Sequence, residues 1–226
     1  MVARSFARAL VLIVLAAFIP SAFAGDLDII PPSYAPPPPP PPSKKLLCYA
    51  GVLGEVVVSH PSFDNVPLPG VYSEYFASGG RGGGIAGCEV LFQSGAFLGA
   101  EFTAAYGSLK GRHAVGYEGN APFEMAARIR FGFMLDPDVA VFVTGGPSDT
   151  YFTSKDAVGV TTAGFNTGGQ ISTGFEVRFL STFRARGEYV YTWPGSDSTL
   201  ITGVQYARIN PTSHAVRIAL MRVFGQ

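Results

Sequence analysis

Apolar and polar residues alternate with a period of two along most of the chain from residue 46 onward. Runs rich in Val, Ile, Phe, Tyr and Thr are separated by clusters of Gly, Pro, Asp and Ser, which is the pattern of β-strands joined by turns. The 3.6-residue period of a helix is missing from this region. The pattern predicts eight strands, near residues 46–59, 83–94, 96–108, 122–135, 138–146, 166–179, 182–194 and 213–224.

The connections between the predicted strands alternate in length. Those after the second, fourth and sixth strands are tight: Ser94-Gly95, Asp136-Pro137-Asp138 and Leu180-Ser181. Those after the first, third, fifth and seventh strands are long, at 60–82, 109–121, 147–165 and 195–212. This alternation is typical of membrane barrels, which have short periplasmic turns and longer loops outside. A tilted strand of about 9–11 residues is long enough to cross the bilayer. We therefore expect an all-β fold, an eight-stranded antiparallel up-and-down transmembrane β-barrel. Eight strands use up the chain, which excludes a porin of about 16 strands.

Each predicted strand has one apolar and one charged face. Around Met125, Ile129 and Phe131 share one parity and Arg128 and Arg130 share the other. An arginine facing lipid costs about 2–4 kcal/mol at the bilayer midplane, so the charges of a membrane barrel must point inward. An eight-stranded interior is just wide enough for side chains to fill it. We expect a structural plug of Arg/Glu pairs and no wide channel, formed by Glu55, Glu89, Glu101, Glu124, Arg128, Arg130, Glu176, Arg178, Arg184, Arg186, Glu188 and Arg217.

The choice of charged residues supports this orientation. The predicted strands contain no Lys, and their one Asp is the turn residue Asp138; Lys44, Lys45, Lys110 and Lys155 fall in the leader or in loops. Lysine is typical of solvated strand edges, whereas the planar guanidinium of arginine forms forked pairs with carboxylates in confined spaces. Aromatic residues near strand ends, such as Trp193, fit the two interfacial girdles of a membrane barrel. The alternative is a soluble secreted barrel with its charges in water.

The first 45 residues precede the predicted barrel, which occupies 46–226. Arg4 and Arg8 are followed by a short apolar run and by Ala22-Phe23-Ala24, the pattern of a secretory signal peptide spanning 1–24. Residues 25–45 form a proline-rich periplasmic leader, in which the run from Pro36 to Pro42 favours polyproline II. The net charge is +0 and charged residues make up 14% of the chain, so we expect no nucleic-acid partner.

The two cysteines and the glycine-rich run give further expectations. In the register that the predicted strands suggest, Cys88 faces a residue near Gly54, too far from Cys48 for a disulfide. We therefore expect two free thiols. The run from Ser78 to Gly84 contains no phosphate-binding Lys, and we expect it to be a flexible loop.

The histidines offer weak candidates for ligand binding. His60 and His214 are expected near the outer mouth, on the two strands that close the barrel. Imidazole is an axial haem ligand, but without a local motif these residues are more often ordinary polar loop residues. Ser213 and His214 are adjacent on a strand and point to opposite faces, which argues against a catalytic dyad between them.

Three segments resemble a known family. FEMAARIRFGFMLDPDVAVFVTGG (123–146), GFEVRFLSTFRARGEYVYT (174–192) and SHAVRIALMRVF (213–224) are similar to segments of small alphaproteobacterial outer-membrane barrels, which belong with the OmpA-like and opacity-like barrels of the porin family. The resemblance implies insertion by the barrel-assembly machinery, guided by a terminal aromatic that Phe224 matches. Gly225-Gln226 beyond it, and an early strand end at Gly146-Pro147, depart from the family pattern. Some members of the family are described as hemin binders.

The sequence thus predicts a protein of the cell outer membrane that is not an enzyme and has no cofactor or metal. Its expected role is envelope-structural, with surface contacts to host or envelope partners made by the outer loops and with outer-membrane lipid around the wall. Three alternatives stay open: a narrow porin for small solutes, a surface hemin-binding barrel and a soluble secreted barrel.

Overall fold

A computed structural model describes residues 44–65, 72–74, 76–112, 118–155, 159, 161–195, 198–202 and 205–224. The expected signal peptide, and the leader up to residue 43, lie outside the described residues. Within the described ranges, no helix is long and apolar enough to cross a membrane.

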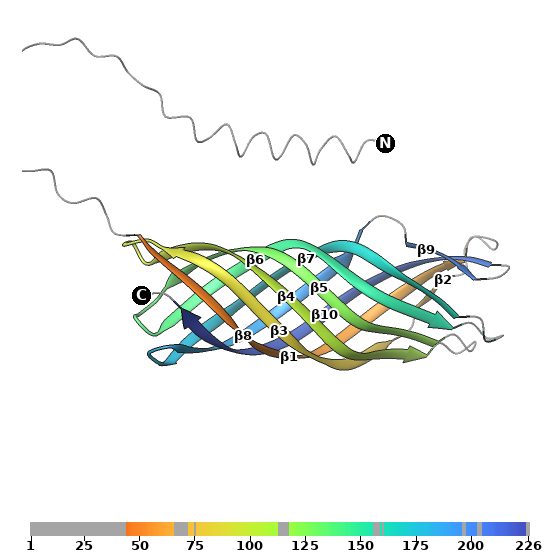
Figure 1. Cartoon of the computed structure of the whole chain (residues 1–226). Coiled ribbons are helices and arrows are strands. Elements are labelled where there is room, and N and C mark those ends of the chain that lie inside the picture. Colours follow the sequence, from red (N-terminus) through yellow and green to blue (C-terminus); the bar gives the residue numbers. More distant parts are fainter. Residues whose placement is uncertain are drawn as a thin grey trace, which may run out of the picture. The chain divides into compact units, whose positions relative to one another are not determined.

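Eight long strands form one closed antiparallel sheet (Figure 1), as the sequence predicts. Each of these long strands pairs with the next long strand in the chain, and β1 pairs with β10 to close the barrel. The short strands β2 (Tyr72–Glu74) and β9 (Ser198–Thr202) pair with one end of β1 and of β10. The eight barrel strands are β1 (Lys45–Asn65), β3 (Ala77–Leu91), β4 (Ala96–Arg112), β5 (Glu118–Met134), β6 (Val139–Lys155), β7 (Thr161–Leu180), β8 (Phe183–Pro194) and β10 (Gln205–Phe224).

Three tight turns lie at one end of the barrel, which we call the tight-turn end; the opposite end is the long-connection end. In the β5–β6 turn, the Asp136 carboxylate accepts hydrogen bonds from the backbone N–H groups of Asp138 (2.7 Å) and Val139 (2.8 Å). In the β3–β4 turn, Gly95 takes a φ of +84°, a conformation that glycine adopts without a steric penalty. The first residues of β1 and the last of β10 lie at this same end (Figure 1).

Several strands run further toward the long-connection end than the sequence analysis expects. The glycine-rich run 78–84 lies inside β3 and is not a loop, and β6 continues through Pro147 to Lys155. Proline has no N–H to donate, and the β5–β6 pairing is interrupted opposite Pro147, between Ala126/Ser148 and Ile129/Gly145.

The longer strands change the expected distribution of charges. They carry Lys and Asp after all, near their ends and beyond the predicted bounds: Lys45, Asp64, Lys110, Asp149 and Lys155.

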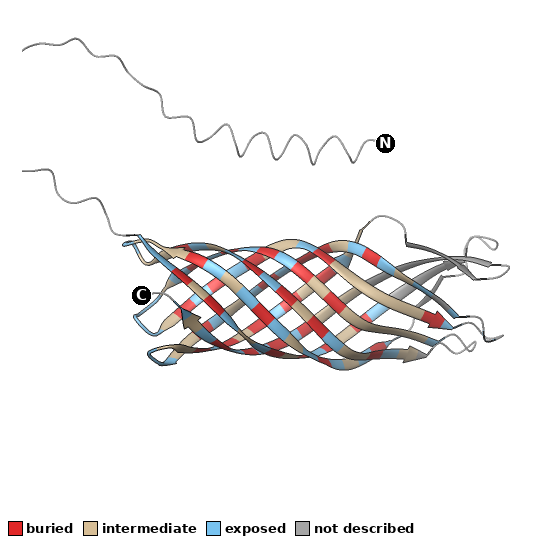
Figure 2. Ribbon diagram, in the orientation of Figure 1, coloured by how far each residue is buried: buried red, intermediate tan, exposed pale blue. Residues whose placement is uncertain are grey.

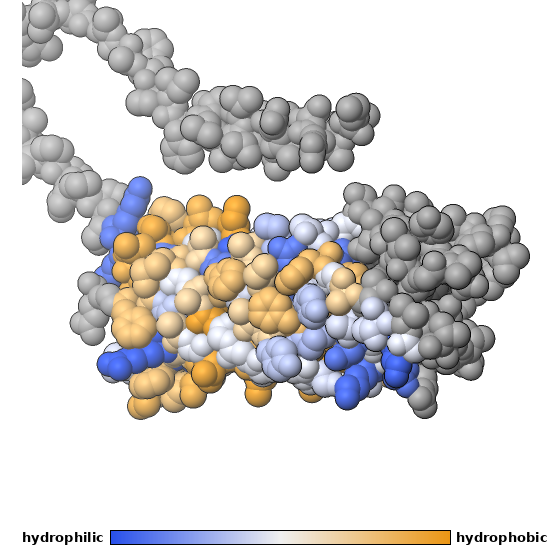
Figure 3. Space-filling view, turned by 45° about the vertical axis from the view of Figure 1, so that its right-hand side comes forward, coloured by the Kyte–Doolittle hydropathy of each residue, from blue (hydrophilic) through white to orange (hydrophobic). Residues whose placement is uncertain are grey.

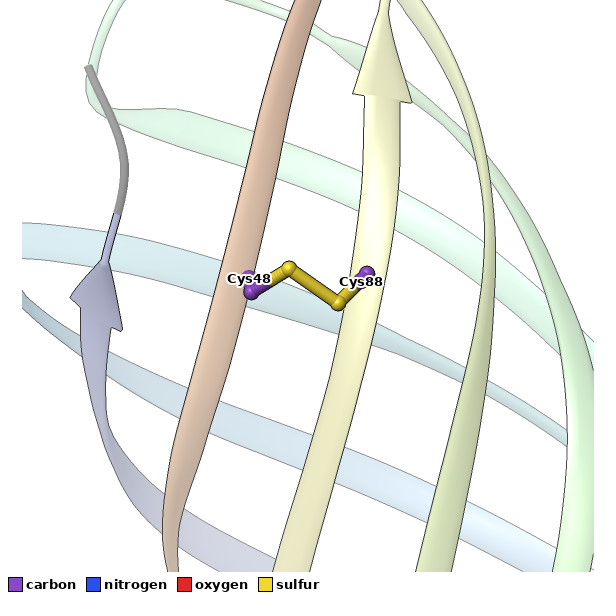
Figure 4. The surroundings of a disulfide bond; sticks show 2 residues. All are labelled: Cys48 and Cys88. Atoms are coloured by element: carbon purple, nitrogen blue, oxygen red, sulfur yellow. A yellow bond between two sulfur atoms is a disulfide. The ribbon is translucent and has the colours of Figure 1, made fainter.

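The expectation of two free thiols is wrong. Cys48 on β1 and Cys88 on β3 form a disulfide, with their Cα atoms 4.0 Å apart (Figure 4). The two cysteines are direct partners in a register that pairs Lys45 with Leu91. The register expected from the sequence is wrong by six positions because the second predicted strand begins too late, at residue 83.

Burial alternates along the barrel strands (Figure 2), and on β6 the alternation ends near Gly145. On β5, Arg128 and Arg130 are 2% and 0% exposed, whereas the intervening Ile129 is 66% exposed. The same alternation of buried charged and exposed apolar residues is seen on β8 and β10. Arg186 and Arg217 are buried, whereas Trp193 and Ile218 face outward. Apolar side chains cover much of the visible wall, as Figure 3 shows. The charged face therefore lines the interior, and the apolar face forms the outer wall.

The outer wall gives a direct test of this orientation. Ile129→Arg, near the middle of β5, should lower the free energy of unfolding by about 2–4 kcal/mol if the wall faces hydrocarbon. The matched control Leu135→Arg lies in the β5–β6 turn, where the cost should be about 0–1 kcal/mol. Urea unfolding from lipid vesicles measures both, and the fluorescence of the single tryptophan, Trp193, reports the transition. Equal losses in the two variants would contradict a membrane-facing wall.

Candidate functional site in the barrel interior

The interior of the barrel holds six glutamates and six arginines, all buried, so that the set is neutral. The strand register places opposite charges directly across from one another. Glu55 on β1 is the direct partner of Arg81 on β3 and of Arg217 on β10, and Glu101 on β4 faces Arg128 on β5. The members are Glu55, Arg81, Glu89, Glu101, Glu124, Arg128, Arg130, Glu176, Arg184, Arg186, Glu188 and Arg217.

The part of this network nearer the long-connection end is centred on Glu55 and Glu124. Arg81 bridges the two carboxylates, at 2.7 Å from each. Arg217 also contacts both, at 2.6 Å from Glu55 and 3.5 Å from Glu124. The Gln170 amide donates a 2.7 Å hydrogen bond to Glu124. Each carboxylate therefore meets two guanidinium groups, which offsets the cost of removing these charges from water.

Arg128 links the two halves of the network. It forms ion pairs with Glu188 and, at 2.6 Å, with Glu101. Glu188 lies 4.0 Å from Arg217, and Glu101 also pairs with Arg186 at 2.8 Å. The ion pairs thus continue without a break from one half of the interior to the other.

Toward the tight-turn end, Glu89 and Glu176 share Arg130 and Arg184. Arg130 lies 2.7 Å from Glu176 and also pairs with Glu89, while Arg184 lies 2.7 Å from Glu89 and 2.8 Å from Glu176. These contacts form a closed ring of two carboxylates and two guanidinium groups.

Aromatic rings pack against the arginines of this half. The Arg130 guanidinium lies 4.6 Å from the ring centroids of both Phe97 and Phe142. Arg186 lies 4.8 Å from the Phe142 centroid, and the Tyr49 hydroxyl donates a 2.6 Å hydrogen bond to Glu101. Cation–π contacts of this kind are worth more when they are removed from water. The interior near the tight-turn end is therefore filled by charged side chains and aromatic rings together.

The structure brings together eleven of the twelve residues that the sequence analysis names for the interior. The exception is Arg178, which is half-buried close to the β7–β8 turn and takes part in no ion pair among the described residues. The ladder has an irregularity there, between Arg178 and Leu180. Arg81 is the twelfth member, and the sequence does not reveal it because its glycine-rich surroundings indicate a loop. The signal available in the sequence is the even spacing of Arg81 and Glu89, which places both on the same face of a strand.

A small cavity lies beyond Arg81 and Glu124, toward the long-connection end. Its volume is about 60 Å³, which is enough to hold at least one water molecule. The Ser148 hydroxyl and the Asn166 amide nitrogen are buried in its wall, and neither has a hydrogen-bond partner among the described residues. Within the described ranges, no group of three or more His, Cys, Asp or Glu side chains could hold a metal ion.

The two candidate histidines lie on the outer wall. His214 is on the outward parity of β10, and its Nδ1 shares a 2.6 Å hydrogen bond with the Tyr189 hydroxyl. His60 is exposed on β1 and packs edge-on against Phe76. The register places His214 opposite Val58, two residues from His60. Ser213 lines the inner cavity, so it and His214 point to opposite faces.

The terminal aromatic Phe224 is exposed on the outer wall at the tight-turn end and pairs with Cys48 across the β1–β10 seam.

Comparison with solved structures bears on the fold. The outer membrane protein OprG from Pseudomonas aeruginosa matches with a TM-score of 0.58 at 10% identity, covering 80% of this chain and 98% of that protein. The fold is that of an outer-membrane β-barrel. The attachment invasion locus protein Ail of Yersinia pestis also matches, with a TM-score of 0.44 at 8% identity, covering 78% of this chain and 98% of its own. The outer membrane protein AlkL in lipid bilayers matches with a TM-score of 0.49 at 10% identity, covering 90% of this chain and 98% of its own. No family model matches the chain, and no curated protein does.

Replacing one arginine at a time distinguishes the network from its surroundings. Arg81→Met leaves Glu55 and Glu124 each with one guanidinium partner fewer, and breaking a buried pair in this way costs about 3–5 kcal/mol. Arg178→Met should change stability by no more than about 0.5 kcal/mol, because it removes none of the described ion pairs. Urea unfolding of both variants in the same vesicles measures the difference. A smaller loss for Arg81→Met than for Arg178→Met would overturn this assignment of the network.

Proposed function

We propose that this chain is an integral outer-membrane barrel, exported by its residues 1–24, with an envelope-structural and surface-contact role and no enzymatic activity. The observation that carries the proposal is the inverted distribution of side chains. Apolar residues form the exposed wall while twelve charges are buried. Soluble monomers rarely expose contiguous apolar patches larger than a few hundred Å², so this wall favours an apolar medium over water.

The charge network supports a closed barrel rather than a narrow porin. Six carboxylates and six guanidinium groups pair with each other across the interior, and aromatic rings fill the space near the tight-turn end. A solute passing through would have to separate these buried ion pairs and leave charges unpaired in the interior. The plug therefore favours a structural role for the interior.

Strand length supports a role at the cell surface. β1 has 21 residues, and β7 and β10 have 20 each, whereas about 9–11 suffice to cross a bilayer. The tight-turn end is fixed near one membrane face by its short turns, so the surplus length extends from the opposite face. β2 and β9 widen this extension by pairing with β1 and β10. We infer that this sheet carries the contacts with host or envelope partners.

The assembly role of the last strand completes the proposal. As in the OmpA-like and opacity-like barrels that the sequence resembles, we propose that the barrel-assembly machinery recognises β10 through its terminal aromatic, Phe224. The exposed ring of Phe224, on the parity of Ile218 and Leu220, supports this role.

Fractionation with detergent extraction tests the membrane location. The protein should sediment with outer membranes, require detergent for extraction and migrate faster in a gel before boiling than after it, because the folded barrel resists unfolding by detergent. The chain with Arg128→Leu and Glu188→Leu keeps the apolar wall and serves as a control that should still fractionate with membranes. A monomer that stays in solution without detergent would refute the proposal.

Planar-bilayer recording tests the closed interior. The purified barrel should insert and give no single-channel steps, because the network occupies the interior from Glu55 to Glu89. Insertion is verified separately by gel migration of the same sample. Regular steps of one amplitude would replace the structural proposal with the narrow porin.

A further inference from the structure

Strand β3 has few side chains that could fix its alignment. Five of the seven residues from Ser78 to Gly84 are glycine, the others being Ser78 and Arg81. Strand register is normally set by the pattern of side chains and is weakly specified in glycine-rich strands, which are prone to slip. In this stretch of the β1–β3 pair, Glu55 opposite Arg81 is the one pair of opposite charges.

A slip of two residues keeps every side chain on its proper face, so face parity does not prevent it. Such a slip places Arg81 opposite Leu53 or Val57, both buried and apolar, instead of opposite Glu55. The charge network would then lose the contacts of Arg81 with Glu55 and Glu124. The alignment of β3 therefore decides whether the interior charges balance.

The Cys48–Cys88 disulfide joins the same two strands (Figure 4). It lies seven residues along the ladder from the Glu55/Arg81 pair. The cysteines are direct partners, so the covalent bond permits only the native alignment. Cys48 is also the direct partner of Phe224 on β10. The bond thus fixes β3 against the strand that later forms the closing seam.

The disulfide lies on the outer wall. Its neighbours on the same face are apolar: Leu46 and Ala50 along β1, Ala86 along β3, and Phe224 and Ala100 across the adjoining strands. Disulfides form by attack of a thiolate, and an apolar medium disfavours a charged thiolate. The bond is therefore much easier to make while the chain is still in water.

We propose that Cys48 and Cys88 are an oxidative modification site of the unassembled chain, and that their disulfide sets the β1–β3 register before insertion. The two thiols lose two electrons and two protons as the S–S bond forms, and a disulfide-bearing oxidant is reduced to its dithiol. The order of events rests on the proposed membrane location; the register function does not.

Reduction of the assembled barrel tests the order of events. The protein is folded into phosphatidylcholine vesicles, and assembly is verified by gel migration, so that failure to insert is seen separately. Water-soluble phosphine should leave the disulfide of the assembled barrel intact over a time that fully reduces the urea-unfolded chain. The reduced, unfolded chain should re-form the bond with oxidised glutathione. Equal reduction rates for the assembled and unfolded protein would overturn the protected location.

Crosslinking tests the register. Val58 and Ser78 are direct partners ten residues along the ladder from Cys48 and Cys88. Hydrogen-bonded and non-hydrogen-bonded pairs alternate along an antiparallel ladder, so at this even spacing cysteines form the same kind of pair as Cys48 and Cys88. Val58→Cys with Ser78→Cys reports the native register, and Val58→Cys with Gly80→Cys reports a slip of two residues. With Cys48 and Cys88 present and bonded, peptide mapping should find only the native reporter link.

With Cys48→Ala and Cys88→Ala, the slip reporter should crosslink with a yield comparable to that of the native reporter. A slip reporter that stays at background in this variant would overturn the proposal.

A second variant covers the case in which the cysteine-free chain does not fold. Gly82 and Gly84 face outward, and a Cβ added at either would meet its nearest atom only at 3.7 Å. Gly82→Val with Gly84→Val supplies side chains opposite Gly54 and Val52, and should restore the native gel migration without the disulfide. Failure of this variant to fold while the oxidised wild type folds would show that the disulfide does more than fix register, and would overturn the proposal.

Discussion

The mutual neutralisation of twelve buried charges is the constraint on which the rest of this barrel depends. A tube with an apolar outer wall can carry charges only inside, and removing one carboxylate or guanidinium from water costs several kcal/mol unless it is well paired. Each interior carboxylate meets at least two guanidinium groups within 4.0 Å. Pairs on adjacent strands depend on register, and pairs across the interior depend on closure. The network therefore forms only when all eight strands are aligned.

The parity of the strands and the positions of the tight turns could be predicted from the sequence because both are local. Ile129 next to Arg130 shows that one face of the strand is apolar and the other charged. Asp136-Pro137-Asp138 identifies a turn without knowledge of any other strand. The ends of the strands could not be predicted as well. Toward the long-connection end the side chains of β6 no longer alternate between the outer wall and the interior, so its extension through Pro147 leaves no periodic signal.

Register is the part of the fold that local patterns could not supply. The error lay in one hairpin, where glycine replaces the side chains that would show the alignment, and it had two consequences. The predicted interior lacks Arg81, and the predicted register pairs Cys88 with a residue six positions from its true partner. Arg178 illustrates a different limit: its parity is right for the interior, but the ladder irregularity near the turn removes it from the network.

These two consequences have one physical origin. Side chains specify the register of β5 through its alternating Arg and apolar residues, and no covalent bond holds that strand. Side chains do not specify the register of β3, and there a disulfide holds the strand to its neighbour. The glycines that face inward explain why side chains were not used instead. A Cβ added to Gly83 would lie 1.9 Å from the backbone oxygen of Ala104, so the close approach of β3 to β4 requires glycine there. The barrel obtains this close packing at the expense of sequence-encoded register, and the disulfide restores the alignment that the charge network needs.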